Sequence, residues 1–281
     1  MDKQAAIRLE GITKRFGEVV ANDNVDLTVY SGEILSLLGE NGSGKTTLMN
    51  MIAGIYYPDA GQIYIKGEPV DIRSPKDSLG LGIGMIHQHF KLVDVLTAAE
   101  NIVLGLHEKG RYDLSAVAAR VKAITDKYGF ALDPMKKIYE MSVSEKQTVE
   151  IVKVLYRGAD ILILDEPTAV LTPQETDKLF KVLRAMRADG KAIIIITHKL
   201  QEVLALSDRV SVLRKGQYVG TVDTRDATAQ SLTDMMVGQA VTLNIDRPQP
   251  HDTVQLLDVK NITVRDKNGI TKLDDVSFTV V

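Results

Sequence analysis

Short apolar runs recur along the chain, and each is closed by a polar or glycine-rich turn. Four of them, Ile34 to Leu38, Ile83 to Ile86, Ile161 to Leu164 and Ala192 to Ile196, contain almost no polar residue. Runs of this length are typical of strands that are buried on both faces of a parallel sheet. The longer segments between them have room for helices, so the pattern predicts an α/β core.

The beginning of the chain has a different pattern. From Ile7 to Val29 the apolar residues recur at short, roughly alternating steps, with polar breaks at Gly17 and at residues 22–24. Alternation is typical of strands with one buried and one solvated face. We therefore expect an antiparallel β-layer that leads into the first strand of the core.

Residues from about 91 to 157 are expected to form a helical insert. Thr97 and the glutamate three residues later have the spacing of a capping box, which marks the start of a helix. Ser115 is expected to cap a second helix, whose apolar residues recur every three or four positions until Gly129. The same periodicity continues from Glu145 to Tyr156.

Composition narrows the class of protein. The chain has 281 residues, a formal net charge of −3 and no cysteine. Its length suits one large α/β domain plus a fragment. The absence of cysteine excludes disulfides and cysteine-based metal sites, and the charge gives no reason to expect nucleic acid as a partner. Because the longest apolar runs are only strand-sized, any membrane role would come through a partner.

A glycine-rich loop joins the strand Ile34 to Leu38 to a helix-compatible segment. Its glycines let backbone N–H groups turn inward around an anion, and the positive end of the helix adds to the attraction. In this G-x-x-x-x-G-K-T pattern, the lysine reaches the β- and γ-phosphates of a nucleotide and the threonine hydroxyl binds Mg²⁺. The candidate phosphate-binding residues are Gly39, Asn41, Gly42, Ser43, Gly44, Lys45, Thr46 and Thr47.

Chemically useful side chains follow three of the other predicted strands. Asp165 and Glu166 come at the end of one strand, where α/β proteins place their ligands. Beside a phosphate loop, Asp165 is expected to bind Mg²⁺ and Glu166 to polarise the attacking water. His198 follows the next strand and would point toward the γ-phosphate, although a lone histidine is more often structural. Gln88 could reach a metal-bound water or lie in a solvated loop.

Taken together, these residues resemble those of the ATP-binding-cassette (ABC) ATPases over about residues 5 to 240. The resemblance implies a P-loop NTPase fold with an antiparallel β-layer, a RecA-like parallel-sheet core and a helical subdomain. It implies ATP and Mg²⁺ as cofactors, with Gln88, Glu166 and His198 as catalytic residues and Gln88 also near the metal. Phe16 resembles the aromatic residue that stacks on adenine, although its position also suits a buried hairpin aromatic.

The signature segment of these ATPases corresponds to Met141 to Glu145, which makes Ser142, Ser144 and Glu145 candidate contacts to the nucleotide of an opposing cassette. In this chain Val143 and Ser144 replace the two glycines of the family pattern. Ser144 puts a side chain where the backbone should approach the γ-phosphate. Thr172 replaces a family aspartate, and it can cap the following helix as aspartate would.

The end of the chain repeats its beginning. The segments 254–259 and 274–280 echo residues 7–12 and 23–29, with four extra residues between the two blocks. We therefore expect a first cassette over residues 5–240, a linker over residues 241–253, and the truncated start of a second cassette over residues 254–281.

Tandem cassettes of this type resemble the ATPase subunits of bacterial importers for simple sugars and nucleosides, and the sequence looks closer to the nucleoside branch. The resemblance implies a peripheral protein on the cytoplasmic face of the membrane. Its partners would be transmembrane permease subunits, a second cassette and, indirectly, a substrate-binding lipoprotein, with no nucleic acid. One alternative is a soluble tandem ATPase that acts as a nucleotide switch in translation or DNA repair. Another is a regulatory module that closes on ATP without hydrolysing it.

Overall fold

The computed structural model describes residues 4–106, 113–239, 254–265, 269 and 271–281. It divides into two compact units, Met1–Val241 and Thr242–Val281. The predicted linker over residues 241–253 lies outside the described residues.

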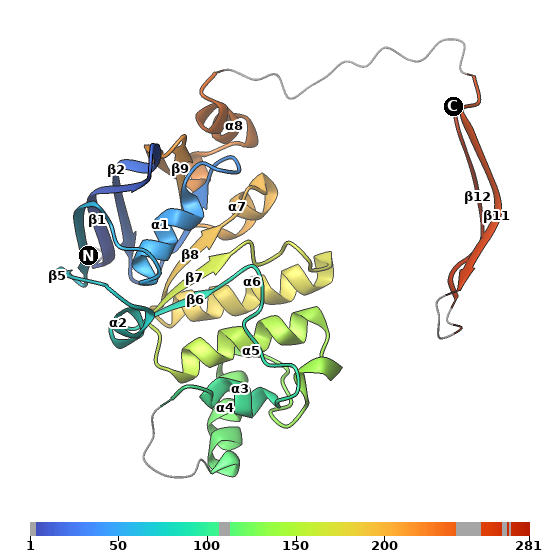
Figure 1. The fold of residues 1–281 in the computed structure, drawn as a ribbon, viewed down its shortest axis with the longest axis horizontal. Helices are drawn as coiled ribbons and strands as arrows, with labels where there is room; N and C mark the ends of the chain where they lie inside the picture. The colour runs from blue at the N-terminus through green and yellow to red at the C-terminus, as the bar shows by residue number, and fades with distance from the viewer. Residues whose placement is uncertain (1–3, 107–112, 240–253, 266–268, 270) are drawn as a thin grey trace. The chain divides into compact units, whose positions relative to one another are not determined.

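The predicted β-layer is a four-stranded antiparallel sheet (Figure 1). Its strands are β1 (Ala5–Phe16), β2 (Val19–Tyr30), β4 (Ala60–Ile65) and β5 (Glu68–Val70), in the order β2-β1-β4-β5. Most apolar residues of β1 and β2 are buried at alternate positions, among them Leu27 and Val29, and the residues between them are half-buried or exposed, as the alternation predicted.

The second sheet has six strands in the order β10-β9-β3-β8-β7-β6. Its five parallel strands are β3 (Ile34–Leu38), β6 (Ile83–Ile86), β7 (Ile161–Asp165), β8 (Ala192–Ile196) and β9 (Arg209–Arg214), and β10 (Gln217–Asp223) is antiparallel to β9. The predicted parallel core is thus confirmed. Because parallel strands share a direction, the residues that follow β3, β7 and β8 emerge at the same edge of the sheet.

Helix α1 (Lys45–Ile52) packs between the two sheets. Side chains of β8 alternate between the faces of the parallel sheet: Ile194 and Ile196 join the cluster that contains α1, whereas Ile193 and Ile195 pack with α6 (Pro173–Ala188) on the other face. Both faces of the parallel sheet are therefore covered, which explains why its strands are continuous apolar runs.

The insert is helical, as predicted, and lies at the end of the unit away from the β-layer (Figure 1). It contains α3 (Ala98–Val103), α4 (Leu114–Tyr128), the short 3₁₀ turn η1 (Ile138–Glu140) and α5 (Val143–Tyr156). One face of α5 packs on α3 and α4 and the other packs on the parallel sheet. Helix α5 therefore connects the helical subdomain to the core.

The predicted start of α4 was wrong by two residues. Asp113, not Ser115, is the N-cap, and the aspartate side chain accepts a hydrogen bond from the backbone N–H of Ser115. Both residue types cap helices well, so the periodicity of the apolar residues did not distinguish between them. The predicted end of α4 is correct: Gly129 follows its last residue in the left-handed conformation, which commonly ends helices.

Four smaller helical elements complete the first unit: α2 (Pro75–Gly80), α7 (Leu200–Leu206), the 3₁₀ turn η2 (Thr224–Asp226) and α8 (Ala229–Val237). The sequence pattern did not reveal α7, which is short and whose N-cap residue, Lys199, makes no capping hydrogen bond with its side chain. Over the ranges that the structure describes, no helix is both long enough and apolar enough to cross a membrane.

The second unit is an antiparallel hairpin of β11 (Leu257–Arg265) and β12 (Thr271–Val280). Its pairing reproduces that of β1 and β2: Val259 faces Phe278 as Leu9 faces Leu27, and Ile262 faces Val276 as Ile12 faces Val25. The same bulge also recurs in both hairpins. The backbone N–H of Asn24 donates to the Thr13 hydroxyl, and that of Asp275 donates to the Thr263 hydroxyl.

This register corrects the repeat alignment. Ile262, not Val259, is the counterpart of Ile12. Asp275 and Asn24 correspond as predicted, so the second hairpin has one extra residue between the blocks and not four. The apolar residues at 254, 256 and 259 and those at 257, 259 and 262 both have the spacing of Ile7, Leu9 and Ile12, so only the strand pairing decides between the two alignments.

We expect Ile194→Ala to destabilise the first unit by roughly 2–5 kcal/mol, because the substitution leaves a cavity between α1 and the parallel sheet. Ile194 is fully buried. The change is measured as the difference in free energy of unfolding in urea. The control is Val170→Ala at a position that is 64% exposed, where the effect should stay within about 0.5 kcal/mol. Equal effects at the two positions would contradict this packing.

Candidate functional site

The carboxyl ends of β3, β7 and β8 open onto a cleft of about 450 Å³. It is the point at which the phosphate loop, the two carboxylates and the histidine meet. The lining residues are Ala21, Asn41, Gly42, Ser43, Gly44, Lys45, Thr46, Thr47, Gln88, Asp165, Glu166, Ala169, Ile196 and His198. Most of the residues that the sequence selected are therefore brought together, although they come from segments far apart in the chain.

Two glycines of the loop are required by close packing. A Cβ atom on Gly39 would lie 2.3 Å from the backbone oxygen of Leu213, and one on Gly44 would lie 2.3 Å from that of Ala21. Gly44 also has a φ of 95° and precedes the first residue of α1. The first N–H groups of α1 have no partners within the helix, so the loop presents donors to the cleft.

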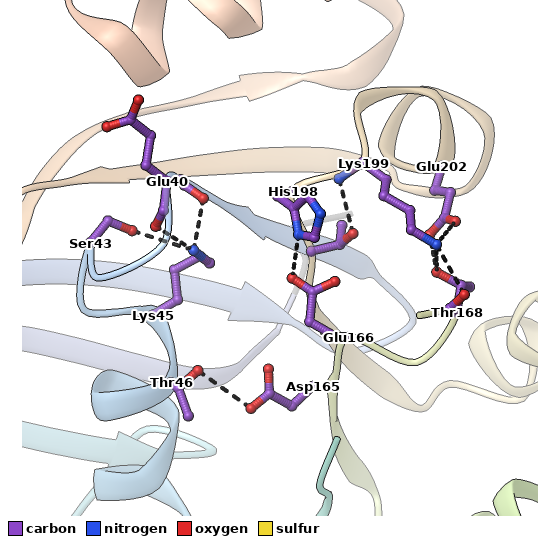
Figure 2. Close-up of polar contacts among 12 residues, drawn as sticks. Glu40, Ser43, Lys45, Thr46, Asp165, Glu166, Thr168, His198, Lys199 and Glu202 are labelled. Atoms are coloured by element: carbon purple, nitrogen blue, oxygen red, sulfur yellow. Dashed lines mark hydrogen bonds and ion pairs between the residues drawn. The ribbon is translucent and has the colours of Figure 1, made fainter. Parts of the chain in front are cut away.

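The Lys45 ammonium group is held inside the loop (Figure 2). It donates to the backbone oxygens of Gly39 at 2.7 Å and Glu40 at 2.8 Å. Burial lowers the pKa of Lys45, and the nearby carboxylates of Glu166 and Asp165 oppose that change. A cation that is largely removed from water, beside a glycine-rich loop at the start of a helix, suits a polyphosphate.

Opposite the lysine, the Thr46 hydroxyl donates to Asp165 Oδ2 at 3.4 Å (Figure 2). Asp165 is 8% exposed, and burial raises the pKa of its carboxyl group, while the hydrogen bond from Thr46 acts in the other direction. Hydroxyl and carboxylate oxygens are the ligands that Mg²⁺ prefers. Within the described part of the chain, no group of three or more His, Cys, Asp or Glu side chains could hold a metal. A metal here would therefore need phosphate or water oxygens as well.

Glu166 and His198 form the third part of the site. Glu166 Oε1 lies 2.8 Å from His198 Nδ1, whereas Glu166 Oε2 is buried and has no hydrogen-bond partner (Figure 2). Glu166 also adopts a φ of 48°, and its backbone N–H donates to the backbone oxygen of Ile196 at 2.9 Å. An unpaired buried carboxylate oxygen is costly, and such costs are concentrated at functional sites. Glu166 therefore lines the cleft with one carboxylate oxygen paired to His198 and the other without a partner.

Phe16 does not line the cleft. It ends β1, is 44% exposed and makes an edge-to-face contact with Tyr56, with 5.1 Å between the ring centroids. The Lys14 ammonium group lies 5.5 Å from the centroid of the same ring. The alternative of a buried hairpin aromatic is therefore excluded, and stacking of this exposed ring on adenine stays a prediction.

The signature residues Ser142, Ser144 and Glu145 also lie outside the cleft, at the start of α5. Ser142 and Glu145 form a capping box that the sequence reading overlooked. Glu145 Oε1 accepts from Lys136 at 2.6 Å, and the Ser144 hydroxyl lies 3.2 Å from that of Ser142. Ser144 and Glu145 line a separate cavity beside α6. In this unit the signature segment therefore does not complete the phosphate site.

Asn22 is a residue behind the phosphate loop that sequence reasoning missed. It is fully buried in β2, and its Nδ2 donates to the backbone oxygen of Gly44 at 3.2 Å. The alternation of apolar and polar residues in β2 does not predict that Asn22 is buried. The strand pairing is irregular near Asn24, and this irregularity places Asn22 on the buried side.

Comparison with known proteins decides the family. The family model described as "ABC transporter" matches residues 22–169, from β2 through the loop after Glu166. The chain belongs to the ABC transporter family. This cassette thus has the nucleotide-binding fold that its phosphate loop indicated, and the predicted fold class is confirmed.

Relatives with assigned functions are similar over nearly the whole chain. The guanosine import ATP-binding protein NupO of Bacillus subtilis (strain 168) is 47% identical over 98% of this chain and 54% of its own length. The glucose import ATP-binding protein TsgD13 of Haloferax volcanii is 44% identical over 100% of this chain and 56% of its own length. The chain therefore spans about half the length of these relatives.

Among solved structures, the ADP conformation of MJ1267, an ATP-binding cassette of an ABC transporter, superposes with a TM-score of 0.74. The match covers 84% of this chain and 99% of MJ1267 at 25% sequence identity. The cassette fold is therefore shared even where the sequences have diverged.

We expect Asp165→Asn to raise the melting temperature of the nucleotide-free cassette at neutral pH. Burial raises the pKa of Asp165 in the folded protein above its value in the unfolded chain. At a pH above both values the carboxylate is charged in the folded and in the unfolded protein, and its burial then lowers the free energy of unfolding. The gain should disappear as pH falls toward about 4, where the unfolded carboxyl group also becomes protonated. The check is thermal unfolding of both proteins across this pH range, with the exposed Asp126→Asn as control. A gain that does not depend on pH would contradict the assignment.

Proposed function

We propose that this cassette binds ATP with Mg²⁺ and hydrolyses it. The observation that carries the proposal is the position of Glu166 in the same cleft as Lys45, Thr46 and Asp165. One oxygen of its carboxylate contacts His198, and the other is buried without a hydrogen-bond partner.

We assign the following roles to the residues of the site. Lys45 and the loop N–H groups would bind the β- and γ-phosphates, while Thr46 and Asp165 would hold Mg²⁺ and Gln88 would lie close to it. The metal, when bound, neutralises charge on the phosphates. Glu166 orients the attacking water and accepts its proton, and His198 holds Glu166 and contacts the γ-phosphate. Phe16 stacks on the adenine from the edge of the β-layer.

A second cassette would complete the site. The hairpin of β11 and β12 shares the register and bulge of β1 and β2, and the chain spans about half of its relatives. We infer that residues 5–240 are one cassette, that residues 241–253 link it to the next, and that residues 254–281 begin the second. Ser142, Ser144 and Glu145 would then face the nucleotide of that second cassette, with Ser144 weakening the contact.

The work that hydrolysis drives is import of a nucleoside or simple sugar. One relative is named for guanosine import and another for glucose import, which supports import as such, and NupO, the guanosine relative, is the more similar of the two by a small margin. The partners would be transmembrane permease subunits and, indirectly, a substrate-binding lipoprotein, with the cassette on the cytoplasmic face of the membrane. A soluble nucleotide switch is not favoured, because these relatives are named for import.

We expect Glu166→Gln to lower kcat for ATP hydrolysis at least a hundredfold in the complete transporter, because the amide cannot accept the proton of the attacking water. ATP should remain bound, so retention of labelled ATP is measured with turnover. The control is Glu68→Gln on the edge strand β5, which should behave as wild type. Unchanged turnover in Glu166→Gln would reject this role for Glu166.

The solute class is tested by ATP turnover of the complete protein with its permease and binding protein in lipid vesicles. We expect nucleosides to stimulate turnover several-fold and pentoses or glucose to have no effect. Stimulation by a sugar alone would retain the import function and reject the nucleoside assignment. Turnover that no solute changes would instead favour the soluble switch.

A further inference from the structure

A cluster of polar side chains cross-links the two loops that carry Glu166 and His198 (Figure 2). Lys199 Nζ donates to the backbone oxygen of Thr168 at 2.9 Å and to its hydroxyl at 3.1 Å. It also forms an ion pair with Glu202 at 3.0 Å. The Thr168 hydroxyl donates in turn to the other oxygen of Glu202. Each of the three N–H bonds of the Lys199 ammonium group thus has an acceptor.

The cluster lies very close in sequence to the reacting groups. Thr168 is two residues after Glu166, and Lys199 directly follows His198. Thr168 is almost fully buried, and Glu202 lies in the first turn of α7. Because the connecting spans are so short, a movement of either loop would move Glu166 relative to His198.

The pair itself is weakly restrained. The His198 side chain is 53% exposed, and the hydrogen bond to Glu166 is the only polar contact of its ring among the described residues. Glu166 has a φ of 48°, a strained conformation for a residue other than glycine that persists only where the surroundings enforce it. Something outside the pair must therefore hold the two loops at the distance that the hydrogen bond needs.

We propose that the cluster of Thr168, Lys199 and Glu202 sets the geometry of the Glu166–His198 pair, with Lys199 as the principal positioning residue. Lys199 contacts none of the residues that bind phosphate in the proposed site, so it acts through the two loops. The kinetic consequence rests on the hydrolysis proposed above, whereas the geometric consequence does not.

The geometry is tested without ATP turnover. In the free protein, the imidazole nitrogen chemical shifts of His198, measured by NMR and assigned by His198→Ala, should indicate a hydrogen-bonded Nδ1. Lys199→Met should remove that signature and Lys199→Arg should largely retain it. Lys122→Met, which removes an exposed lysine ion pair on α4, is the matched control and should leave it unchanged. A His198 spectrum that is identical in Lys199→Met and wild type would overturn the proposal.

The kinetics are tested in the complete transporter. Lys199→Met should lower kcat by roughly tenfold to a hundredfold with little change in KM for ATP, because misplaced catalytic groups affect the chemical step. In a His198→Ala background the same substitution should have almost no further effect on kcat. An equal loss in both backgrounds, together with a lower melting temperature, would show a role in stability alone.

Glu202→Gln provides a second variant if Lys199→Met does not fold. It keeps the shape of the side chain but removes the ion pair, and it should give a smaller loss of kcat with the same dependence on His198. Absence of ATP turnover in the wild-type complex would reject the proposed hydrolysis. Turnover that is normal in wild type, Lys199→Met and Glu202→Gln alike would reject only the positioning role.

Discussion

Removal of charge from water at one edge of the parallel sheet is the constraint on which the rest of the structure depends. Lys45 and Asp165 are each less than a tenth exposed, and the Glu166 side chain is nearly as well buried. Burial of charge costs free energy unless opposite charges and hydrogen bonds compensate for it. The compensation here is partial, since burial lowers the pKa of Lys45 and raises that of Asp165. A polyphosphate with its metal would supply what the protein alone lacks.

The scaffold holds these groups by packing from both sides. Helix α1 lies between the antiparallel and the parallel sheets, which fixes the loop at its start, and Asn22 ties that loop to β2 from behind. Helix α5 reaches from the signature segment to the core, and Gln147 on it donates to the backbone oxygen of Pro167 at 2.7 Å. The residue after Glu166 is therefore held by the helix that begins with the signature.

The fold and most of the cleft could be predicted because the responsible signals are local. Apolar runs gave β3, β6, β7 and β8, and the capping boxes at Thr97 and Thr172 are present as expected. The phosphate loop was recognisable because close backbone packing requires glycine at fixed positions. Where two local signals competed, as at Asp113 and Ser115, the pattern of apolar residues could not choose between them.

Local patterns in the sequence predicted most of the strands and helices and the phosphate loop, because periodicity, caps and glycine positions act over a few residues, although the short helix α7 gave no such signal. Strand register and contacts between distant residues could be known only from the folded chain. The counterpart of Ile12 in the second hairpin, for example, is decided by strand pairing. The contact between Lys199 and Thr168 joins residues 31 positions apart, and only the neighbouring positions of β7 and β8 in the sheet bring them together.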